Sequence, residues 1–149
     1  MFVLAFSFSW LYLIGLISLW LLIFASVFDL LILFANKQGV HAQRTVTHQK
    51  LSNGDENDIF LHLKNNYSFP INIEVIDELP EQFQFRNFKL FKKLQSAEAQ
   101  KTKYTLRPVS RGEFHFGNII ALAHSPLGLA NRRFVFNQKL MLPCYPSFL

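Results

Sequence analysis

The sequence predicts a mainly β protein, in which an N-terminal transmembrane helix precedes an antiparallel immunoglobulin-like β-sandwich. From Met1 to Ala35 the only charged side chain is Asp29, and a spanning helix needs about 20 apolar residues. From about Arg44 onward, apolar residues alternate with polar ones, which is typical of strands with one buried face. We therefore assign residues 1–36 to a transmembrane region and residues 44–146 to a β-sandwich domain.

The apolar run is longer than one membrane span. As one straight helix it would measure roughly 50 Å at 1.5 Å per residue, whereas the hydrocarbon core is about 30 Å thick. We expect a break at residues 7–10, with Trp10 and Tyr12 at an interface, and a complete span at about 11–34. Residues 1–9 then read as the tail of an earlier apolar segment. A cleaved signal peptide is not expected, because no Lys or Arg precedes the long run.

Charges near the end of the run bear on orientation. Asp29 lies two turns before Lys37, so we expect an interfacial or helix-packing carboxylate. A proton relay would need a second ionisable group in the span.

Three basic residues, Lys37, Arg44 and Lys50, follow the run with no acidic residue between them, as on cytoplasmic flanks. The sandwich is therefore expected to face the cytoplasm.

Strands are expected where apolar residues recur at every second position. Turn signals separate them, and about seven short strands at roughly 8–12-residue spacing favour a sandwich of immunoglobulin type. Residues 94–101 are the only plausible helical or loop insertion. The alternating runs are residues 58–64, 71–75, 103–107, 113–116 and 134–142. The turn signals are residues 52–55, 65–66, 79–80, 111–112, 117–118 and 126–128.

No metal or cofactor site is expected. No histidine has a partner at metal-ligand spacing, and Cys144 is the single cysteine. Asp55, Glu56 and Asp58 lack the ligand positions of a calcium loop, so we interpret them as a polar turn. The histidines are His41, His48, His62, His115 and His124, of which His62 and His115 are interpreted as solvated strand residues.

Catalytic machinery is not expected either. Asp77 and Glu78 are adjacent on a strand, so their carboxylates point in different directions. No G-x-S-x-G motif occurs, and the glycines at 112, 117 and 128 precede no helix that could bind a phosphate. We assign no catalytic, cofactor-binding or metal-ligating residue.

Basic and aromatic residues are interleaved over residues 85–93, a pattern that can bind single-stranded nucleic acid. A simpler interpretation is favoured, in which the aromatic residues supply core and the lysines protect an edge strand. No nucleic-acid partner is expected. The motifs at 111–112 and 125–129 are likewise interpreted as corners between strands, because neither has an evident partner elsewhere in the chain.

Three motifs carry a resemblance to a known family: Asn-Gly-Asp-Glu-Asn at 53–57, Asp-Glu-Leu-Pro at 77–80, and Arg-Gly at 111–112 with Ser-Pro-Leu-Gly-Leu at 125–129. With the apolar start, they resemble a family of bacterial membrane proteins known only as domain of unknown function 58. Its members are often encoded beside MoxR-type AAA+ ATPases. Many members have Asp where this chain has Ser125, so no role of that carboxylate is transferred.

The resemblance implies two membrane helices, this β region, and then a von Willebrand factor A-like domain after Tyr145-Pro146. Both ends of the chain then look truncated, and the metal-ion site of the A-like domain would lie outside this sequence. The implied role is a non-enzymatic scaffold in a MoxR-type ATPase system at the bacterial inner membrane, with the lipid bilayer and the ATPase as partners. The alternative is an envelope-facing sandwich that binds a polymer or a protein.

Overall fold

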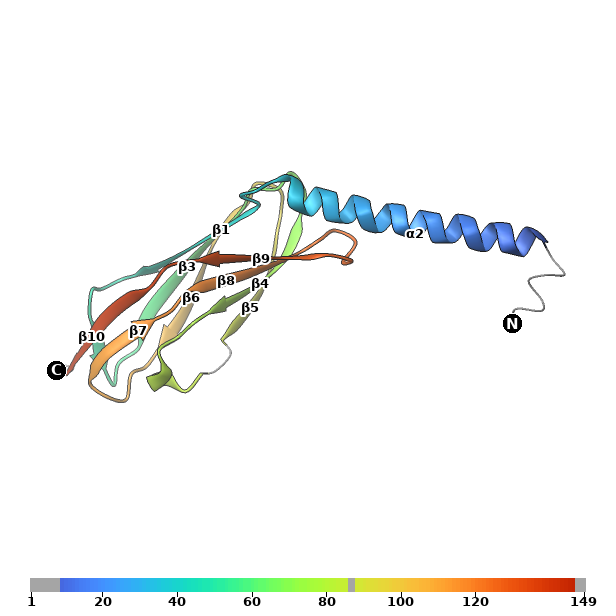
Figure 1. The fold of residues 1–149 in the computed structure, drawn as a ribbon. Coiled ribbons are helices and arrows are strands. Elements are labelled where there is room, and N and C mark those ends of the chain that lie inside the picture. Colours follow the sequence, from blue (N-terminus) through green and yellow to red (C-terminus); the bar gives the residue numbers. More distant parts are fainter. Residues whose placement is uncertain (1–8, 86–87, 147–149) are drawn as a thin grey trace.

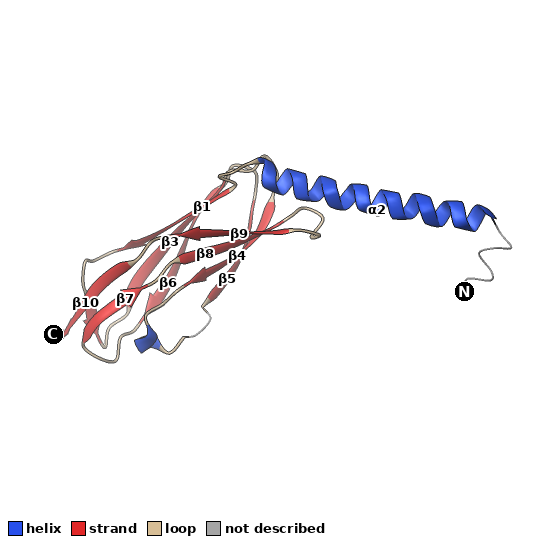
Figure 2. Cartoon of the chain, in the orientation of Figure 1, coloured by secondary structure: helices blue, strands red, loops and turns tan. Residues whose placement is uncertain are grey.

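The computed structural model describes residues 9–85 and 88–146. These residues form one long helix, α2 (Ser9–Ala35), a 3-10 turn, η1 (Glu81–Phe83), and ten strands (Figure 2). The strands are β1 (Val40–Val46), β2 (Leu51–Asn53), β3 (Asn57–Asn65), β4 (Ile71–Asp77), β5 (Lys89–Leu94), β6 (Ala99–Leu106), β7 (Gly112–Phe116), β8 (Ile119–His124), β9 (Asn131–Phe136) and β10 (Leu140–Pro146).

Helix α2 extends away from the sandwich (Figure 1). It covers the predicted span of 11–34, and from Trp10 to Ala35 it is long and apolar enough to cross a membrane. Most of its apolar side chains are exposed, unlike those of a helix buried in a protein core. The predicted break at 7–10 and the proposed tail of an earlier segment at 1–9 involve residues 1–8, which fall outside the described residues.

The strands form two layers of immunoglobulin type. One layer is the sheet β1-β3-β6. The other combines β5-β4-β8-β9 with β2-β10-β7. Strands β7 and β8 pair antiparallel with β10 and β9 along one long strand pair, and the register shifts by one residue at the break between Phe116↔Leu140 and Ile119↔Phe136. If β1 with β2, β7 with β8 and β9 with β10 are each counted as one interrupted strand, the ten strands correspond to the seven expected.

One pair departs from the antiparallel pattern. After β1 the chain passes to the second layer, where β2 runs parallel to β10, with Leu51 opposite Cys144. The sandwich therefore begins at Val40, four residues before the expected start, and the first strand contributes to both layers.

Alternation places the core between the layers. Strand β4 buries every second side chain from Ile71 through Val75 to Asp77, and β3 does the same from Ile59. Phe114, Ile119 and Leu142, on other strands of the second layer, complete the core that β4 of that layer forms with β3 of the first. The period-two prediction of a mainly β sandwich is thus confirmed.

Residues 94–101, expected as a helical or loop insertion, form a turn at 95–98, while Leu94 ends β5 and 99–101 belong to β6. Two other local predictions were wrong in part. Residues 117–118 do not reverse the chain, because β8 continues from β7. Phe85 and Phe91 are 62% and 70% exposed, so they do not supply core, whereas Phe88 packs against the core with its ring tilted at 46° to that of Tyr104 and 4.5 Å between the ring centroids. The expected edge position is confirmed for β5, which ends its sheet.

Candidate functional site

The first polar cluster joins α2 to the tip of the β8–β9 hairpin. Asp29 is only 1% exposed. One carboxylate oxygen accepts from Ser125 Oγ and, at 3.2 Å, from the backbone N–H of Leu129; the other accepts from the N–H of Leu127 at 3.2 Å. A carboxylate taken out of water needs such donors. Of the two structural interpretations of Asp29, the helix-packing one is confirmed.

The hairpin tip is shaped to present these donors. Gly128 N–H donates to Ser125 O at 3.1 Å, which closes a four-residue turn with Pro126 in its second position. Gly128 has φ +74°, a conformation that glycine adopts without the cost other residues incur. Ser125 Oγ also accepts from Ala130 N–H at 3.0 Å. The turn geometry predicted for Pro126 and Gly128 is confirmed.

The view that residues 125–129 have no partner elsewhere was wrong. Their partner, Asp29, precedes Ser125 by 96 positions, and no periodicity links residues so far apart. Two signals could have suggested the contact: a lone carboxylate in an apolar run needs hydrogen-bond donors, and a Ser-Pro-x-Gly turn can offer several N–H groups in one direction.

The second cluster caps the C-terminal end of α2. The last carbonyls of a helix have no partner within it. Arg132 of β9 donates to Leu33 O at 3.0 Å, to Asn36 O at 2.6 Å and to Lys37 O at 3.2 Å. Tyr67 Oη also donates to Leu33 O, at 2.7 Å. A guanidinium at this end of a helix is favourable for the helix dipole as well.

The linker between helix α2 and strand β1 is fixed by hydrogen bonds with Asn66 and by contact with Tyr67. Asn36 Nδ2 donates to Asn66 O at 2.9 Å, and Asn66 Nδ2 donates to Gln38 O at 2.8 Å. Gly39 lies against the ring of Tyr67, which leaves no room for a side chain there. Helix, linker and hairpin thus form one connected unit, here called the junction (residues 29–39, 66–67 and 125–132).

A third cluster lies inside the sandwich. Arg44 and Asp77 form a fully buried ion pair, and Tyr104 Oη donates to Asp77 at 2.5 Å. Arg44 also donates to Gln138 O at 2.9 Å and lies over the ring of Phe116. Because each group faces another protein group, the arrangement stabilises the two layers against each other.

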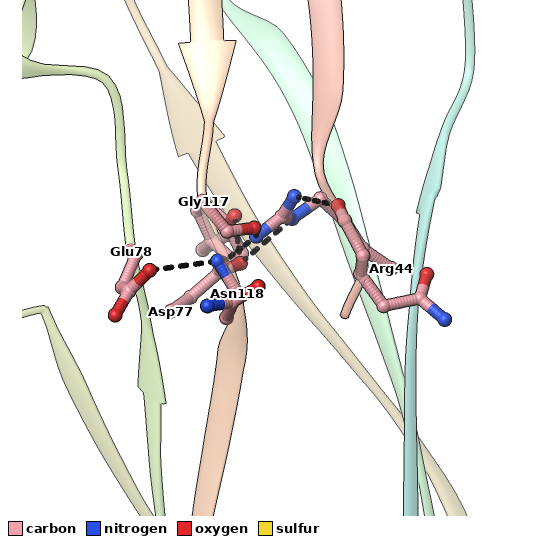
Figure 3. A network of polar contacts seen from close by, with 7 residues as sticks. Arg44, Asp77, Glu78, Gly117 and Asn118 are labelled. Carbon is pink, nitrogen blue, oxygen red and sulfur yellow. Dashed lines mark hydrogen bonds and ion pairs between the residues drawn. The ribbon is translucent and has the colours of Figure 1, made fainter. Parts of the chain in front are cut away.

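This cluster occupies the break in the long strand pair (Figure 3). Arg44 donates to Gly117 O at 3.3 Å, while Glu78 Oε2 accepts from Asn118 N–H at 2.7 Å. Gly117 N–H donates to Glu78 O at 2.8 Å. Asp77 and Glu78 therefore point to different partners, as expected from their adjacency. The residues interpreted from sequence as a turn form an irregularity of the β-bulge kind, where side chains replace the missing ladder bonds.

Arg44 was assigned to the basic flank of the span, and that assignment was wrong. Its side chain is 1% exposed and paired with Asp77. Lys50 follows β1, which leads away from the helix. Lys37 alone of the three remains beside the helix end, but the fold adds two exposed basic residues there: Lys64, whose backbone pairs with that of His41, and Arg133 of β9.

The histidines, acidic residues and cysteine that were considered for a metal or catalytic site do not come together in the described residues. Among residues 9–85 and 88–146, no group of three or more His, Cys, Asp or Glu side chains could hold a metal ion. His62 bonds Thr45 at 2.9 Å and His124 bonds Asn131 at 2.7 Å. His62 is half-buried rather than solvated, whereas His115 is exposed. Burial raises the pKa of the Cys144 thiol, which keeps it neutral and unreactive.

Comparison with known proteins establishes the fold. No family model and no curated protein matches this chain. The ASH/PapD-like domain of human CEP192 is similar, with a TM-score of 0.54, 14% identity, and coverage of 74% of this chain and 88% of that one. The CARDB domain of a Pyrococcus furiosus protein, solved in complex with di-metal ions, has a TM-score of 0.54, 10% identity, and coverage of 72% and 94%. The described domain is an immunoglobulin-like sandwich of this kind.

The turn at Gly128 leads to a stability prediction. Gly128→Ala places a side chain in open space but at φ +74°, which costs roughly 1–2 kcal/mol. We expect the free energy of unfolding to fall by that amount in denaturant titrations. Gly128→Asn should lose less, because asparagine tolerates this conformation. Equal losses for the two variants would contradict a conformational cause.

A second prediction concerns alkaline pH. Burial and the neighbouring Asp77 raise the pKa of Tyr104, whereas an unfolded tyrosine titrates near pH 10. Stability from this group is therefore complete below about pH 10 and declines above it, by about 1.4 kcal/mol per pH unit. Tyr104→Phe should flatten this decline relative to the wild type when unfolding is measured between about pH 9 and 11. Parallel pH profiles would refute the assignment.

Proposed function

We propose that this chain is a non-enzymatic, membrane-anchored module whose sandwich is held in a fixed orientation to its helix. The observation that carries the proposal is the junction. A helix that served only as a tether would need a flexible linker. Here the four residues between α2 and β1 are fixed by Asn36, Asn66 and Tyr67, and the last turns of the helix are bonded to β9 and to the β8–β9 hairpin.

The arrangement of the two ends supports a spacer role. The described C-terminal residues leave the sandwich at the end opposite the helix (Figure 1). A segment that continued the chain, such as the A-like domain implied by the family resemblance, would therefore be displaced from the membrane by the length of the sandwich.

The partner that we propose for this module is the one implied by the family resemblance, a MoxR-type AAA+ ATPase.

Charge near the helix end supports a cytoplasmic orientation. Lys37, Lys64 and Arg133 are exposed around the junction, and basic residues are enriched on cytoplasmic flanks. We place the module in the bacterial inner membrane on this basis, with the sandwich inside.

Spin-label distances test the fixed orientation. Labels at Leu22→Cys on α2 and Lys139→Cys beyond β9, in a Cys144→Ala background in lipid nanodiscs, should give a narrow distance distribution. Combining Asp29→Ala with Arg132→Ala should broaden it, because both sets of contacts between α2 and the hairpin strands are lost. The matched control, Lys103→Ala, removes only an exposed ion pair with Asp58 and should leave the distribution narrow. A broad distribution in the parent protein would refute the rigid module.

Topology and partner need a separate experiment. Single cysteines at exposed sandwich positions, read with a membrane-impermeant maleimide in intact cells, should stay unlabelled until the inner membrane is opened. Labelling in intact cells would favour the envelope-facing alternative.

Affinity purification tests the partner. The tagged natural protein should recover the ATPase, and the Asp29→Ala, Arg132→Ala variant should recover less of it.

A further inference from the structure

We propose that the tip of the β8–β9 hairpin, residues 125–130, is itself a lipid-binding element that inserts into the headgroup–acyl boundary beside α2. This inference rests on the proposed membrane span. It adds a second surface, outside helix α2, at which the chain contacts the bilayer.

The tip has the side chains of a membrane-inserting loop. Its sequence, Ser-Pro-Leu-Gly-Leu-Ala, carries no charge. Leu127 and Leu129 are 57% and 58% exposed, although their own backbone groups are fixed to the helix. Two neighbouring leucines held outward on a rigid turn form an apolar surface that water does not favour.

The backbone N–H donors of the tip are all bonded within the protein. Non-helical backbone near hydrocarbon needs its polar groups satisfied within the protein. Ser125 N–H donates to Ala130 O, and Gly128 N–H to Ser125 O; Ala130 N–H donates to Ser125 Oγ. The N–H groups of Leu127 and Leu129 donate to Asp29, and Pro126 has none. Every N–H in the tip is therefore bonded, and the same bonds satisfy the carboxylate of Asp29.

The depth of Asp29 sets the depth of the tip. Trp10–Ala35 has 26 residues, about 39 Å at 1.5 Å per residue. Centred on a hydrocarbon core of about 30 Å, such a helix projects about 4–5 Å beyond it at each end. Asp29 lies six residues, or about 9 Å, before Ala35, so it falls close to or just inside the hydrocarbon boundary. The hairpin tip bonded to it lies at the same level, with Lys37 and Arg133 on the headgroup side.

Environment-sensitive labels test this directly in the full chain. Single cysteines at Leu127, Leu129, Val109 or Leu21, in a Cys144→Ala background, would carry the fluorophore NBD in phosphatidylcholine–phosphatidylglycerol vesicles. Leu21 is in the middle of α2. Val109 is a matched control, because it is 83% exposed in the loop between β6 and β7. Quenchers are a nitroxide attached near the top of the lipid acyl chain and iodide in the buffer.

We expect labels at 127 and 129 to emit at shorter wavelength than the label at 109, and to lose intensity to the nitroxide lipid but little to iodide. The label at 109 should show the reverse. If labels at 127 and 129 behave like 109 while 21 is quenched by the lipid, the tip does not insert and this inference is wrong, but the anchor stands. If 21 also escapes the lipid quencher, the membrane anchor itself is refuted, and the tip inference with it.

Discussion

Asp77→Leu is expected to lower the free energy of unfolding by about 3–5 kcal/mol, the cost of leaving one partner of a buried ion pair without the other. Arg44 would keep its charge at a site where its side chain is 1% exposed, and the remaining carbonyl partners cannot neutralise it. Tyr104 would lose its acceptor as well. Chemical denaturation of the whole chain in detergent, followed by near-UV circular dichroism, measures the loss.

The control for this variant is Asp58→Leu. Asp58 pairs with Lys103 at 2.8 Å, but both side chains are substantially exposed, so that pair contributes only about 0–1 kcal/mol. Combining Asp77→Leu with Arg44→Met should recover part of the loss, because apolar residues of similar size often replace a buried pair with little cost. If the Asp77 and Asp58 variants were equally stable, the buried pair would not hold the layers together.

Gly39→Ala is expected to be the most disruptive small substitution at the junction. A Cβ at this position would overlap the ring of Tyr67, which is 3% exposed, stacked near Phe69 and bonded to Leu33 O. Forcing an atom into such packing costs roughly 1–3 kcal/mol. The helix end should also loosen, so we expect lower stability together with faster proteolysis at residues 36–39.

Gly15→Ala is the matched control, because a Cβ there meets no atom within 4 Å; it should cause no loss of stability and no new cleavage. Adding Tyr67→Leu to Gly39→Ala should cost less than the sum of the two single changes, since the smaller side chain removes the overlap. Strict additivity would show that the ring of Tyr67 is not what excludes a side chain at residue 39.

Much of the fold follows from local pattern. The apolar run that became α2 and the alternation that became β3, β4 and β7 depend on residues within one element, where period and burial are directly coupled. The turn at Pro126 and Gly128 was predictable for the same reason. The irregularity at Gly117-Asn118 was not, because a polar Gly-Asn pair fits a chain reversal and a strand break equally well. Only the pairing of β7 and β8 with β10 and β9 decides between them.

Neither the junction nor the buried pair of Arg44 and Asp77 could be predicted from such local patterns. Arg44 looked like a solvated flank residue, Asp29 like an isolated carboxylate, and residues 125–129 like an unpartnered corner. Each is a charged or donor-rich group whose partner lies far along the chain: Asp77 for Arg44 and Asp29 for Ser125.

By itself, the sequence determined that an apolar helix precedes a β-sandwich and that the chain turns within residues 52–55 and 126–128, because side-chain burial and turn geometry depend on neighbouring residues. Only the tertiary structure decided that the helix and the sandwich form one unit, because the burial of Asp29 and the capping of the helix by Arg132 are hydrogen-bond requirements met by residues almost a hundred positions away. The same long-range contacts turn the corner at residues 125–130 into the proposed second contact with the membrane.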